Sequence, residues 1–383
     1  MKSKNILITG GAGFIGTHLS NRLVNSGYVV TVLDNLSPQI HGQCIDRSSY
    51  NFLKDRTRFI KGDVCCREDW QKALVSQSAI IHLASETGTG QSMYDVEQYV
   101  NVNIRGTAIL LDILAKEKHH IEKIILASSR AVYGEGKYQC NEDGVFYPKQ
   151  RNVSDLDRGL FEFKCNLCNR KLKIMPTDEA SELAPISIYG FTKLAQEQII
   201  QLVGKALDVP YTILRYQNVF GPGQSLANPY TGILSIFSTQ IKNGNDIEIY
   251  EDGQESRDFV YISDVIDATV SCIDDPMANN EIFNVGSGVA LSVLDVAEAL
   301  KKLYNSKINI IISGNYRIGD IRHNLADLTK IKSLLNFKPQ VDFFEGIKRF
   351  SEWVNSQSIN KDVYSDTISE LKKSNLFRKT KGI

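Results

Sequence analysis

The sequence predicts an α/β fold: a doubly wound parallel sheet, interrupted by an insert that contains cysteines and followed by a smaller C-terminal α/β lobe. Three observations predict it. Short apolar runs alternate with helical segments through the first third of the chain. A glycine-rich turn joins the first apolar run to the first helical segment. After Gly221-Pro222-Gly223 the regular alternation gives way to a mixed pattern.

The strands of the parallel sheet are expected at six apolar runs. These runs are nearly continuous in apolar character, which is typical of parallel strands that are covered by helices on both faces. They are Asn5–Thr9, Val29–Leu33, Arg58–Lys61, Ala79–Leu83, Lys123–Ala127 and Val209–Arg215. Helical segments are expected between them, including Ile15–Asn25 and Val96–Ala115.

The segment from Gly134 to Pro185 has no sustained periodicity and holds three cysteines. A structureless loop of this length is uncommon inside a compact domain, so we expect the insert to have local structure of its own. In the C-terminal lobe we expect these helices and strands: Ile233–Lys242, Ser263–Cys272, Ser292–Leu303, Ile247–Tyr250 and Lys307–Ile312. The resulting division is a sheet domain over 1–133 and 186–222, an insert over 134–185, a lobe over 223–355 and a peripheral tail over 356–383.

Composition limits the kind of partner. The chain has 383 residues, with 44 Lys plus Arg and 44 Asp plus Glu, so its formal net charge is zero. A neutral chain has no overall field that attracts nucleic acid or a membrane surface, and we expect neither as a partner. No apolar run approaches the length of a transmembrane helix. The seven cysteines are an odd number and are scattered, which favours reduced thiols and a cytoplasmic location.

The glycine-rich turn has the sequence Gly10-Gly11-Ala12-Gly13-Phe14-Ile15-Gly16. It follows a strand and opens a helix, as the dinucleotide-binding turn of a Rossmann fold does. Glycines allow a tight turn and let the backbone approach a pyrophosphate, which then lies at a helix N-terminus. A glycine-rich turn without a ligand is disfavoured by this context. The candidate cofactor residues here are Gly10, Gly13, Phe14, Ile15 and Gly16.

Two acidic residues end the next two strands. Asp34 lies where a carboxylate would bind the adenosine ribose hydroxyls, and it would repel a 2′-phosphate. The sequence therefore favours NAD over NADP. Asp63 follows the third strand and could accept a hydrogen bond from the adenine amino group, although it could equally be a strand-end cap.

Tyr189 and Lys193 are four residues apart and therefore share one helix face. A lysine ammonium one turn away would favour the phenolate and make the tyrosine a usable base. Ser129 ends the fifth strand, where its hydroxyl could bind a substrate oxygen that alternates between alcohol and ketone. His82 ends the fourth strand, and we interpret it as a structural histidine.

These residues belong to a longer ordered set. It comprises the Gly10 loop, Asp34, Asp63, the His82 strand, Asn103, the Ser129 segment, Tyr189 with Lys193, the run from Leu214 to Gln224, Arg257-Asp258-Phe259-Val260 and Arg317-Ile318-Gly319-Asp320. The chain resembles the extended short-chain dehydrogenase/reductases of the nucleotide-sugar epimerase/dehydratase family over roughly residues 4–355, apart from the insert.

The resemblance implies bound NAD and a nucleoside-diphosphate sugar. Tyr189 would take the proton of the sugar hydroxyl, Lys193 would hold the nicotinamide ribose and Ser129 would bind the reacting oxygen. It adds seven residues to the cofactor site: Asn35, Val64, Leu83, Ala84, Asn103, Tyr189 and Lys193. On the substrate side it implies contacts from Asn218, Arg257, Arg317 and Asp320, and forked arginine donors suit a diphosphate.

The motif before Val132-Tyr133-Gly134 separates reactions within the family. Dehydratases that resemble this chain place Asp-Glu there and related decarboxylases keep a Glu, whereas this chain has Arg130-Ala131. We therefore expect oxidation at C4 followed by return of the hydride, an epimerisation. The chain most resembles the dTDP-L-rhamnose 4-epimerase group, from the runs Gly88–Tyr94 and Asn228–Leu234 and from the insert. A UDP-hexose 4-epimerase, a nucleotide-sugar 4-ketoreductase and a non-catalytic NAD-binding scaffold remain as alternatives.

The insert contains Cys165-Asn166-Leu167-Cys168, which has the spacing of a metal-binding turn, and Cys140 lies upstream. Three thiolates and one further ligand would form a tetrahedral structural zinc site, with Asp143 as the best candidate for the fourth ligand. Reduced cysteines in a loop are the alternative. Resemblance to the family also suggests a homodimer formed through the helices near 96–116 and 189–206.

Overall fold

A computed structural model describes residues 4–41, 47–226, 228, 230, 232–358, 368, 370 and 372–380. Its centre is a parallel sheet of seven strands in the order β13-β9-β5-β4-β1-β2-β3. The strands are β1 (Asn5–Thr9), β2 (Val29–Asp34), β3 (Arg58–Lys61), β4 (Ala79–His82), β5 (Lys123–Ser129), β9 (Tyr211–Tyr216) and β13 (Glu281–Val285). Every pairing in this sheet is parallel, with Leu7 opposite both Thr31 and Ile80. The predicted doubly wound α/β fold is confirmed.

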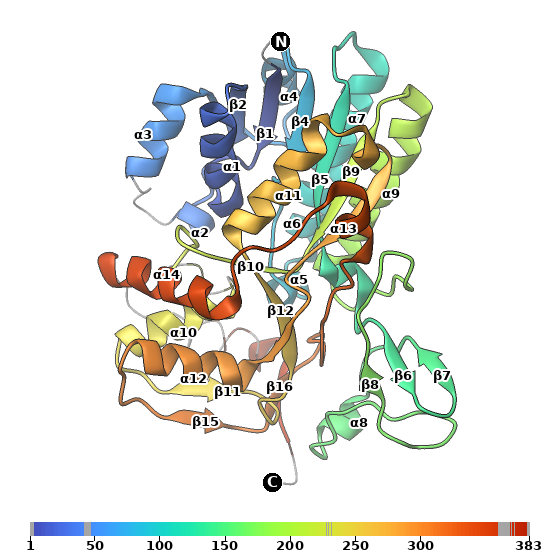
Figure 1. Cartoon of the computed structure of the whole chain (residues 1–383), viewed down its shortest axis with the longest axis vertical. Coiled ribbons are helices and arrows are strands. Elements are labelled where there is room, and N and C mark those ends of the chain that lie inside the picture. The colour runs from blue at the N-terminus through green and yellow to red at the C-terminus, as the bar shows by residue number, and fades with distance from the viewer. Residues whose placement is uncertain are drawn as a thin grey trace.

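Helices cover both faces of the sheet (Figure 1). They are α1 (Phe14–Asn25), α3 (Arg47–Arg56), α4 (Arg67–Leu74), α7 (Gly106–Lys116), α9 (Ile188–Leu207) and α11 (Ile262–Asp274). Successive strand residues point to opposite faces. Ile6 and Ile8 of β1 therefore pack in the core that includes α1 and α11, whereas Leu7 packs in the core that includes α4, α7 and α9. Two separate apolar cores hold the helices on the sheet.

The helix expected over Val96–Ala115 is one continuous helical stretch with an irregular centre. Short α6 (Val96–Tyr99) leads into a π-helical segment, Val100–Arg105, which continues into α7. π-helical turns often occur at functional sites. The π segment carries Asn103, one of the expected cofactor residues.

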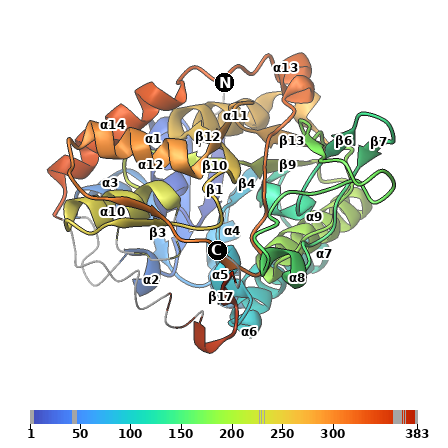
Figure 2. The same cartoon turned by 90° about the horizontal axis from the view of Figure 1, so that it is seen from below.

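The C-terminal lobe lies beyond the carboxyl ends of the strands, as the insert does, at the opposite flank of this end of the molecule (Figures 1 and 2). It contains α10 (Ile233–Lys242), α12 (Val293–Leu303) and α14 (Phe343–Ser356), together with the parallel pair β11 (Ile247–Ile249) and β15 (Ile310–Ile312). A three-stranded sheet, in the order β10-β12-β14, lies between this lobe and the main sheet; its strands are β10 (Asn218–Phe220), β12 (Ser256–Tyr261) and β14 (Ala290–Ser292).

The boundary expected at residue 223 is wrong for β13. This strand follows a long stretch of lobe sequence and then pairs in parallel with β9, so it belongs to the main sheet. α13 (Thr329–Leu335) also reaches back, since Ile331 packs in the core that contains Phe283 of β13. The sheet domain and the lobe are therefore interleaved along the chain.

The insert has local structure, as expected. It forms an antiparallel sheet in the order β7-β6-β8, from β6 (Tyr138–Cys140), β7 (Gly144–Phe146) and β8 (Lys173–Ile174), together with the short helix α8 (Val153–Leu156). The expectation of a peripheral tail after residue 356 is wrong for β17 (Phe377–Lys379). β17 pairs with β16 (Asn315–Arg317), and the Phe377 ring packs on the Tyr250 ring. Burial of these two aromatic side chains in one apolar cluster holds this part of the tail on the lobe.

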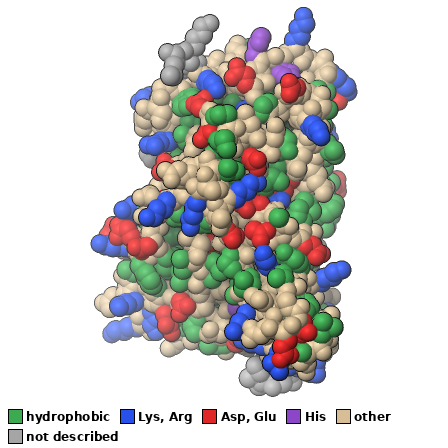
Figure 3. All heavy atoms as spheres, turned by 45° about the vertical axis from the view of Figure 1, so that its right-hand side comes forward, with side chains coloured by type: hydrophobic (Ala, Val, Ile, Leu, Met, Phe, Trp, Pro, Cys, Tyr) green, Lys and Arg blue, Asp and Glu red, His purple; other side chains and the backbone are tan. Residues whose placement is uncertain are grey.

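Other short helices among the described residues are α2 (Pro38–His41), α5 (Thr89–Ser92) and the 3₁₀ turns Arg130–Tyr133 and Pro276–Ala278. Acidic and basic side chains lie interspersed on the face shown in Figure 3, in keeping with the zero net charge. Among the described residues, no helix has the length and apolar character needed to cross a membrane.

Candidate active site

The glycine-rich loop joins β1 to α1 at the carboxyl edge of the sheet. Gly10 has a φ of +66°, and a Cβ on it would lie 2.8 Å from the Ala84 backbone nitrogen. A Cβ on Gly16 would lie 2.4 Å from the Gly10 carbonyl oxygen. The loop therefore packs too tightly for side chains at these positions. The N-cap of α1, Gly13, offers no side-chain cap, so backbone N–H groups at this helix end are available to an anion.

Asp34 lies against this loop. Its carboxylate accepts hydrogen bonds from the backbone nitrogens of Ala12 (2.9 Å) and Leu36 (2.8 Å). Asn35 donates to the Asp63 carboxylate over 3.1 Å, and Asp63 also accepts from the Cys65 backbone nitrogen. The structure thus brings three of the expected adenosine-side residues to one end of the sheet.

His82 is fully buried at the end of β4. Its two ring nitrogens contact the hydroxyls of Thr9 (2.7 Å) and Thr107 (3.0 Å). Burial, assisted by the Lys193 charge, lowers the pKa of His82 to about 3, so the ring stays neutral. The prediction of a structural histidine is confirmed.

Asn103 is fully buried beside the loop that follows β4. Its side chain accepts from the Glu86 nitrogen (2.8 Å) and donates to the Glu86 oxygen (3.1 Å) and to the Thr192 hydroxyl (2.9 Å). These bonds tie the Leu83–Glu86 segment to α9. The expected cofactor residue thus positions the loop that contains Leu83 and Ala84.

Ser129, Tyr189 and Lys193 lie where β5 ends and α9 begins. Ser187 caps α9 by accepting from the Gly190 nitrogen over 3.1 Å, which places Tyr189 in the first helical turn. The Ser129 hydroxyl accepts from the Ala131 nitrogen and also hydrogen-bonds Tyr189. The Lys193 ammonium donates to the Ala127 carbonyl over 3.0 Å. Three residues that the sequence separates by up to 64 positions therefore share one buried corner.

The electrostatics of this corner differ from the expectation. Burial raises the pKa of Tyr189, and the groups that oppose this rise are the Ser129 hydroxyl and the Arg130 guanidinium. Lys193 is not among them, and burial lowers its own pKa to about 7. The expected priming of the phenol by Lys193 is therefore not found. The cation that favours the phenolate is Arg130. In the sequence, this position indicated only that the acid found in dehydratases is replaced.

A buried ion pair fixes α9 to the sheet and was also missed. Arg215 of β9 binds Glu197 through Nε (3.0 Å) and through a terminal nitrogen (2.7 Å). Ser128 donates to the same carboxylate over 2.5 Å, and the Tyr133 hydroxyl accepts from Arg215 over 2.8 Å. This arrangement holds the Ser129 strand end and the helix of Tyr189 in register. Its signal in the sequence was an arginine inside an otherwise apolar strand.

The expected substrate-side residues lie on β10, β12 and β16 and in the turn after β16. Asn218 has a buried side-chain oxygen without a hydrogen-bond partner in the described part of the chain. Arg257 donates to the carbonyls of Ile321 and Arg322. Arg317 pairs with Asp320 over 2.8 Å. The charges of Arg257 and Asp320 both act on Arg130, so substrate-side and catalytic-side groups share one electrostatic environment.

Two tyrosines and a residue near the C-terminus also meet beside this region. The Tyr94 and Tyr230 hydroxyls lie 2.5 Å apart, and Glu370 accepts from them over 3.1 and 2.6 Å. Gly88, in the same segment as Tyr94, would bring a Cβ within 3.3 Å of Tyr230. Both tyrosines fall in the runs that the resemblance singled out, whereas nothing in the local sequence indicated Glu370.

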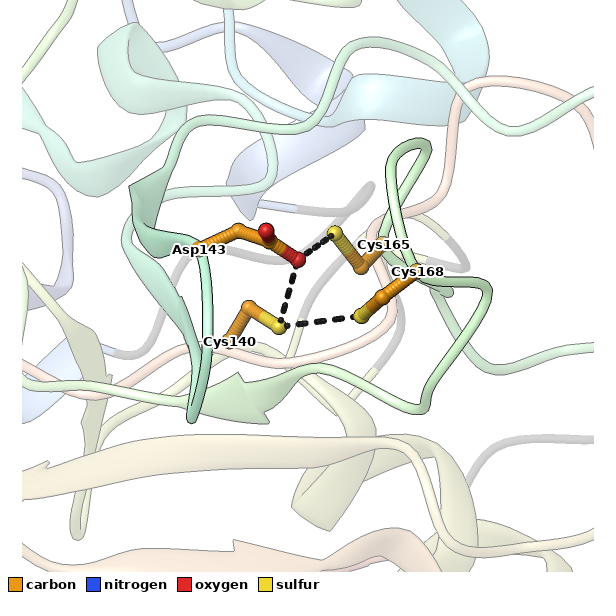
Figure 4. Close-up of side chains that lie close together, drawn as sticks. All are labelled: Cys140, Asp143, Cys165 and Cys168. Carbon is orange, nitrogen blue, oxygen red and sulfur yellow. Dashed lines mark hydrogen bonds between the residues drawn. The ribbon is translucent and has the colours of Figure 1, made fainter.

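The three insert cysteines lie together with Asp143 (Figure 4). Their sulfur atoms and one carboxylate oxygen all lie within 4.8 Å of one another. The cluster lies in the insert, where its side chains hydrogen-bond one another.

Comparison with known proteins agrees with this geometry. A profile of the NAD dependent epimerase/dehydratase family matches residues 6–152 and 169–286. The dTDP-L-rhamnose 4-epimerase of Burkholderia thailandensis is 39% identical over 355 residues, which cover 92% of this chain and 95% of that protein. The UDP-N-acetyl-alpha-D-glucosaminuronate decarboxylase of Bacillus cytotoxicus is 30% identical over 91% of this chain and 97% of that protein.

Solved structures give the same result. The UDP-glucose 4-epimerase of Thermotoga maritima with UDP-glucose superposes with a TM-score of 0.75 at 28% identity, over 92% of this chain and 99% of that one. The UDP-glucuronic acid 4-epimerase of Bacillus cereus, in complex with UDP-glucuronic acid and NAD, superposes with a TM-score of 0.73 at 27% identity, with the same coverage.

Proposed function

Because this chain belongs to the NAD dependent epimerase/dehydratase family, we propose that it is an enzyme that inverts C4 of a nucleoside-diphosphate sugar with NAD as its cofactor. The observation that carries the proposal is the corner at the end of β5. A half-buried tyrosine, a serine and a lysine meet there, and the same sheet carries a glycine-rich loop that opens a helix.

The residues around the loop fit NAD. The uncapped helix end at Gly13 suits the pyrophosphate. Asp34, buried and carrying a carboxylate, suits the adenosine ribose and disfavours a 2′-phosphate. Asn35, Asp63 and Val64 would line the adenine side, and Leu83 and Ala84 the path toward the nicotinamide. When bound, NAD supplies the hydride acceptor and donor for C4.

The chain's own residues would handle the proton. Tyr189 would take the proton from the sugar 4-hydroxyl and return it, while Ser129 holds the same oxygen. Lys193 would hold the nicotinamide ribose. Arg130 would favour the phenolate of Tyr189, because its charge already opposes the effect of burial on the pKa of that phenol.

The identity of residues 130 and 131 supports epimerisation over elimination. Loss of water from the oxidised sugar needs an acid beside the Tyr189 corner, and the positions before Val132 hold Arg130 and Ala131. Glu179 of the insert instead accepts from the Asn284 backbone nitrogen over 2.7 Å. The 4-keto sugar would therefore stay intact and receive hydride on its opposite face after turning in the pocket.

For the substrate we propose dTDP-L-rhamnose. The 39% identity to the Burkholderia thailandensis enzyme over nearly the whole of both chains supports this choice. Asn218, Arg257, Arg317 and Asp320 would contact the nucleotide diphosphate or its surroundings. The unpartnered Asn218 oxygen suits a donor on the ligand.

The test is incubation of the purified chain with a panel of dTDP-, UDP- and GDP-sugars, followed by NMR of the C4 configuration. We expect dTDP-L-rhamnose to equilibrate with its C4 epimer without net consumption of NADH. Inversion of a UDP-hexose alone would reassign the substrate, and stoichiometric consumption of NADH would make the protein a 4-ketoreductase. No conversion of any sugar by NAD-loaded protein would overturn the enzyme proposal.

We also propose a homodimer. The outer side of α9 exposes Phe191 and Leu202, which are 52% and 72% accessible, at a spacing that places them along one stripe of the helix. Val96 and Val100 are exposed on the neighbouring helical stretch. Sedimentation velocity should give the mass of two chains, and Leu202→Glu should shift it toward one. A monomeric wild-type protein at micromolar concentration would refute the dimer.

A further inference from the structure

The insert holds two short turns of the same design. In the first, Cys140 and Asp143 are three residues apart and Gly144 follows with a φ of +89°. In the second, Cys165 and Cys168 are three residues apart and Asn169 follows with a φ of +61°. Each turn thus presents two potential ligands and then reverses through a left-handed residue. Glycine and asparagine are the residues that adopt this conformation most readily.

Each turn lies between paired strands. Cys140 faces Gly144 in the ladder of β6 and β7. The Cys165 nitrogen donates to the Arg170 carbonyl over 2.7 Å, and Lys164 pairs with Lys171 just outside it. The Leu167 nitrogen points at the Cys165 sulfur over 3.4 Å.

The four ligand atoms have the spacing of a metal site. The Asp143 carboxylate oxygen lies 3.2 Å from the Cys140 sulfur and 3.0 Å from the Cys165 sulfur, and the Cys140 and Cys168 sulfurs are 3.4 Å apart (Figure 4). Zinc–sulfur bonds of about 2.3 Å place tetrahedral sulfurs about 3.8 Å apart, so small shifts would admit the ion. A disulfide would join only two of the three sulfurs, at about 2.05 Å.

The insert needs such support because its own core is small. Its apolar cluster has four buried members: Tyr138, Cys140, Cys165 and Leu172. Two of the four are cysteines of the cluster itself. A segment with so little buried apolar surface is commonly held by disulfides or by a metal. We propose that Cys140, Asp143, Cys165 and Cys168 bind one structural zinc ion.

The site is also connected to the C-terminal lobe. Glu162, three residues before Cys165, accepts from Arg322 over 3.0 and 2.7 Å. The Arg322 side chain is fully buried and also binds Glu251 and Asp252 of the lobe. Arg257 in turn donates to the Arg322 carbonyl over 3.0 Å. The zinc would therefore fix the backbone that presents Glu162, and through Arg322 it would hold Arg257 in place.

This second role rests on the proposed function, whereas the zinc site itself does not. The family profile passes from residue 152 to residue 169 and so leaves out Cys165 and Cys168. The metal site is thus a feature of this chain's insert, and it can be tested whether or not the enzyme assay succeeds.

The first test is metal analysis of the full chain, expressed in zinc-supplemented medium and purified without chelator. We expect about one zinc per chain in wild type and in Cys66→Ser, a partly exposed thiol outside the cluster. Cys165→Ser and Asp143→Ala should lose most of the zinc. Asp143→Cys should retain it, because a fourth thiolate completes the tetrahedron. Wild type without zinc, or Cys165→Ser with a full complement, would overturn the site.

Cobalt substitution gives a readout that does not depend on folding yield. The cobalt-loaded wild type should show the intense visible bands of a tetrahedral thiolate site, and Asp143→Cys should strengthen the sulfur-to-metal charge transfer. Weak octahedral bands would contradict the geometry.

For the positioning role, Asp143→Ala should raise KM for the nucleotide sugar several-fold with little change in NAD affinity. An unchanged KM in zinc-free protein would refute that role and leave the zinc site standing.

Discussion

Tyr189 is the residue on which the proposed chemistry depends most directly. Its hydroxyl hydrogen-bonds Ser129, and its ring lies edge-on to the Tyr99 ring with the two centroids 6.5 Å apart. Tyr189→Phe should lower kcat about 10²- to 10⁴-fold, because it removes the proton acceptor and little else. Isothermal titration should show that NAD still binds, because the other groups proposed to hold the dinucleotide, from the Gly10 loop to Lys193, remain in place. If Tyr189→Phe turned over substrate at the wild-type rate, Tyr189 would not be the base.

Arg130 provides a second prediction at the residue level. Its charge lowers the pKa of Tyr189 against the larger effect of burial, which raises it. Arg130→Gln removes that charge, so the pKa of the phenol should rise further. The base is active when it is deprotonated, and the rising limb of kcat/KM should therefore move to higher pH. A pH profile of both proteins checks this; a limb that stays in place, or moves to lower pH, would contradict the role.

At the level of elements, the loop between β1 and α1 depends on glycine for two separable reasons. Gly10 combines a left-handed backbone with a Cβ position 2.8 Å from the Ala84 nitrogen. Gly27 has a φ of +86° but nothing within 4 Å of its Cβ position, so it isolates the backbone effect. Gly27→Ala should cost about 1–2 kcal/mol of unfolding free energy. Gly10→Ala should cost more and should weaken NAD binding, as measured by urea unfolding and titration calorimetry.

Equal costs for the two alanine variants, with NAD affinity unchanged in both, would show that the approach of Gly10 to the Ala84 backbone is not required. The comparison is informative because both glycines lie in the same βαβ unit.

The elements that the sequence predicted well are those with a local signal. β1 and β3 have the bounds expected from their apolar runs, and α10 spans Ile233–Lys242 as expected. β13 was missed because five residues within a mixed region do not show which sheet they join. The catalytic trio was predicted from spacing and position, whereas the effect of Arg130 depends on burial and on distances across the fold. For the same reason no local pattern indicated the partners of Arg322 or Glu370.

At the level of the whole molecule, two parts of the chain converge on one side of the proposed substrate site. The insert contributes Glu135, Arg151 and Glu162, and the lobe contributes Glu251 and Arg322. Burial raises the pKa of Glu135 to about 7. Removing one partner of a buried ion pair leaves an uncompensated charge, which destabilises the fold more than forming the pair stabilises it. The network therefore favours one placement of the insert relative to the lobe.

The network predicts how the placement responds to acid. Burial opposes ionisation of Glu162, but hydrogen bonds from His323 and Arg322 outweigh it and lower its pKa to about 2. A carboxyl whose folded pKa is depressed stabilises the fold above its unfolded pKa of about 4.3 and loses that contribution as the pH falls toward 2. Glu162→Gln should therefore cost on the order of 3 kcal/mol at pH 7, at about 1.4 kcal/mol for each unit of pKa.

The difference in unfolding free energy between wild type and Glu162→Gln should narrow below about pH 4.3, as urea unfolding at a series of pH values would measure. Asp155→Asn is the matched control, because Asp155 forms an exposed pair with Arg158 in the same insert and such pairs contribute about 0–1 kcal/mol. Two results would mean that the Arg322 contact does not hold insert and lobe together. The loss of unfolding free energy in Glu162→Gln could be as small as that in Asp155→Asn, or it could stay constant down to pH 3. In that case the path from the zinc turns to Arg257 would have to run through the packing of Tyr138 on His323, whose ring centroids are 6.4 Å apart.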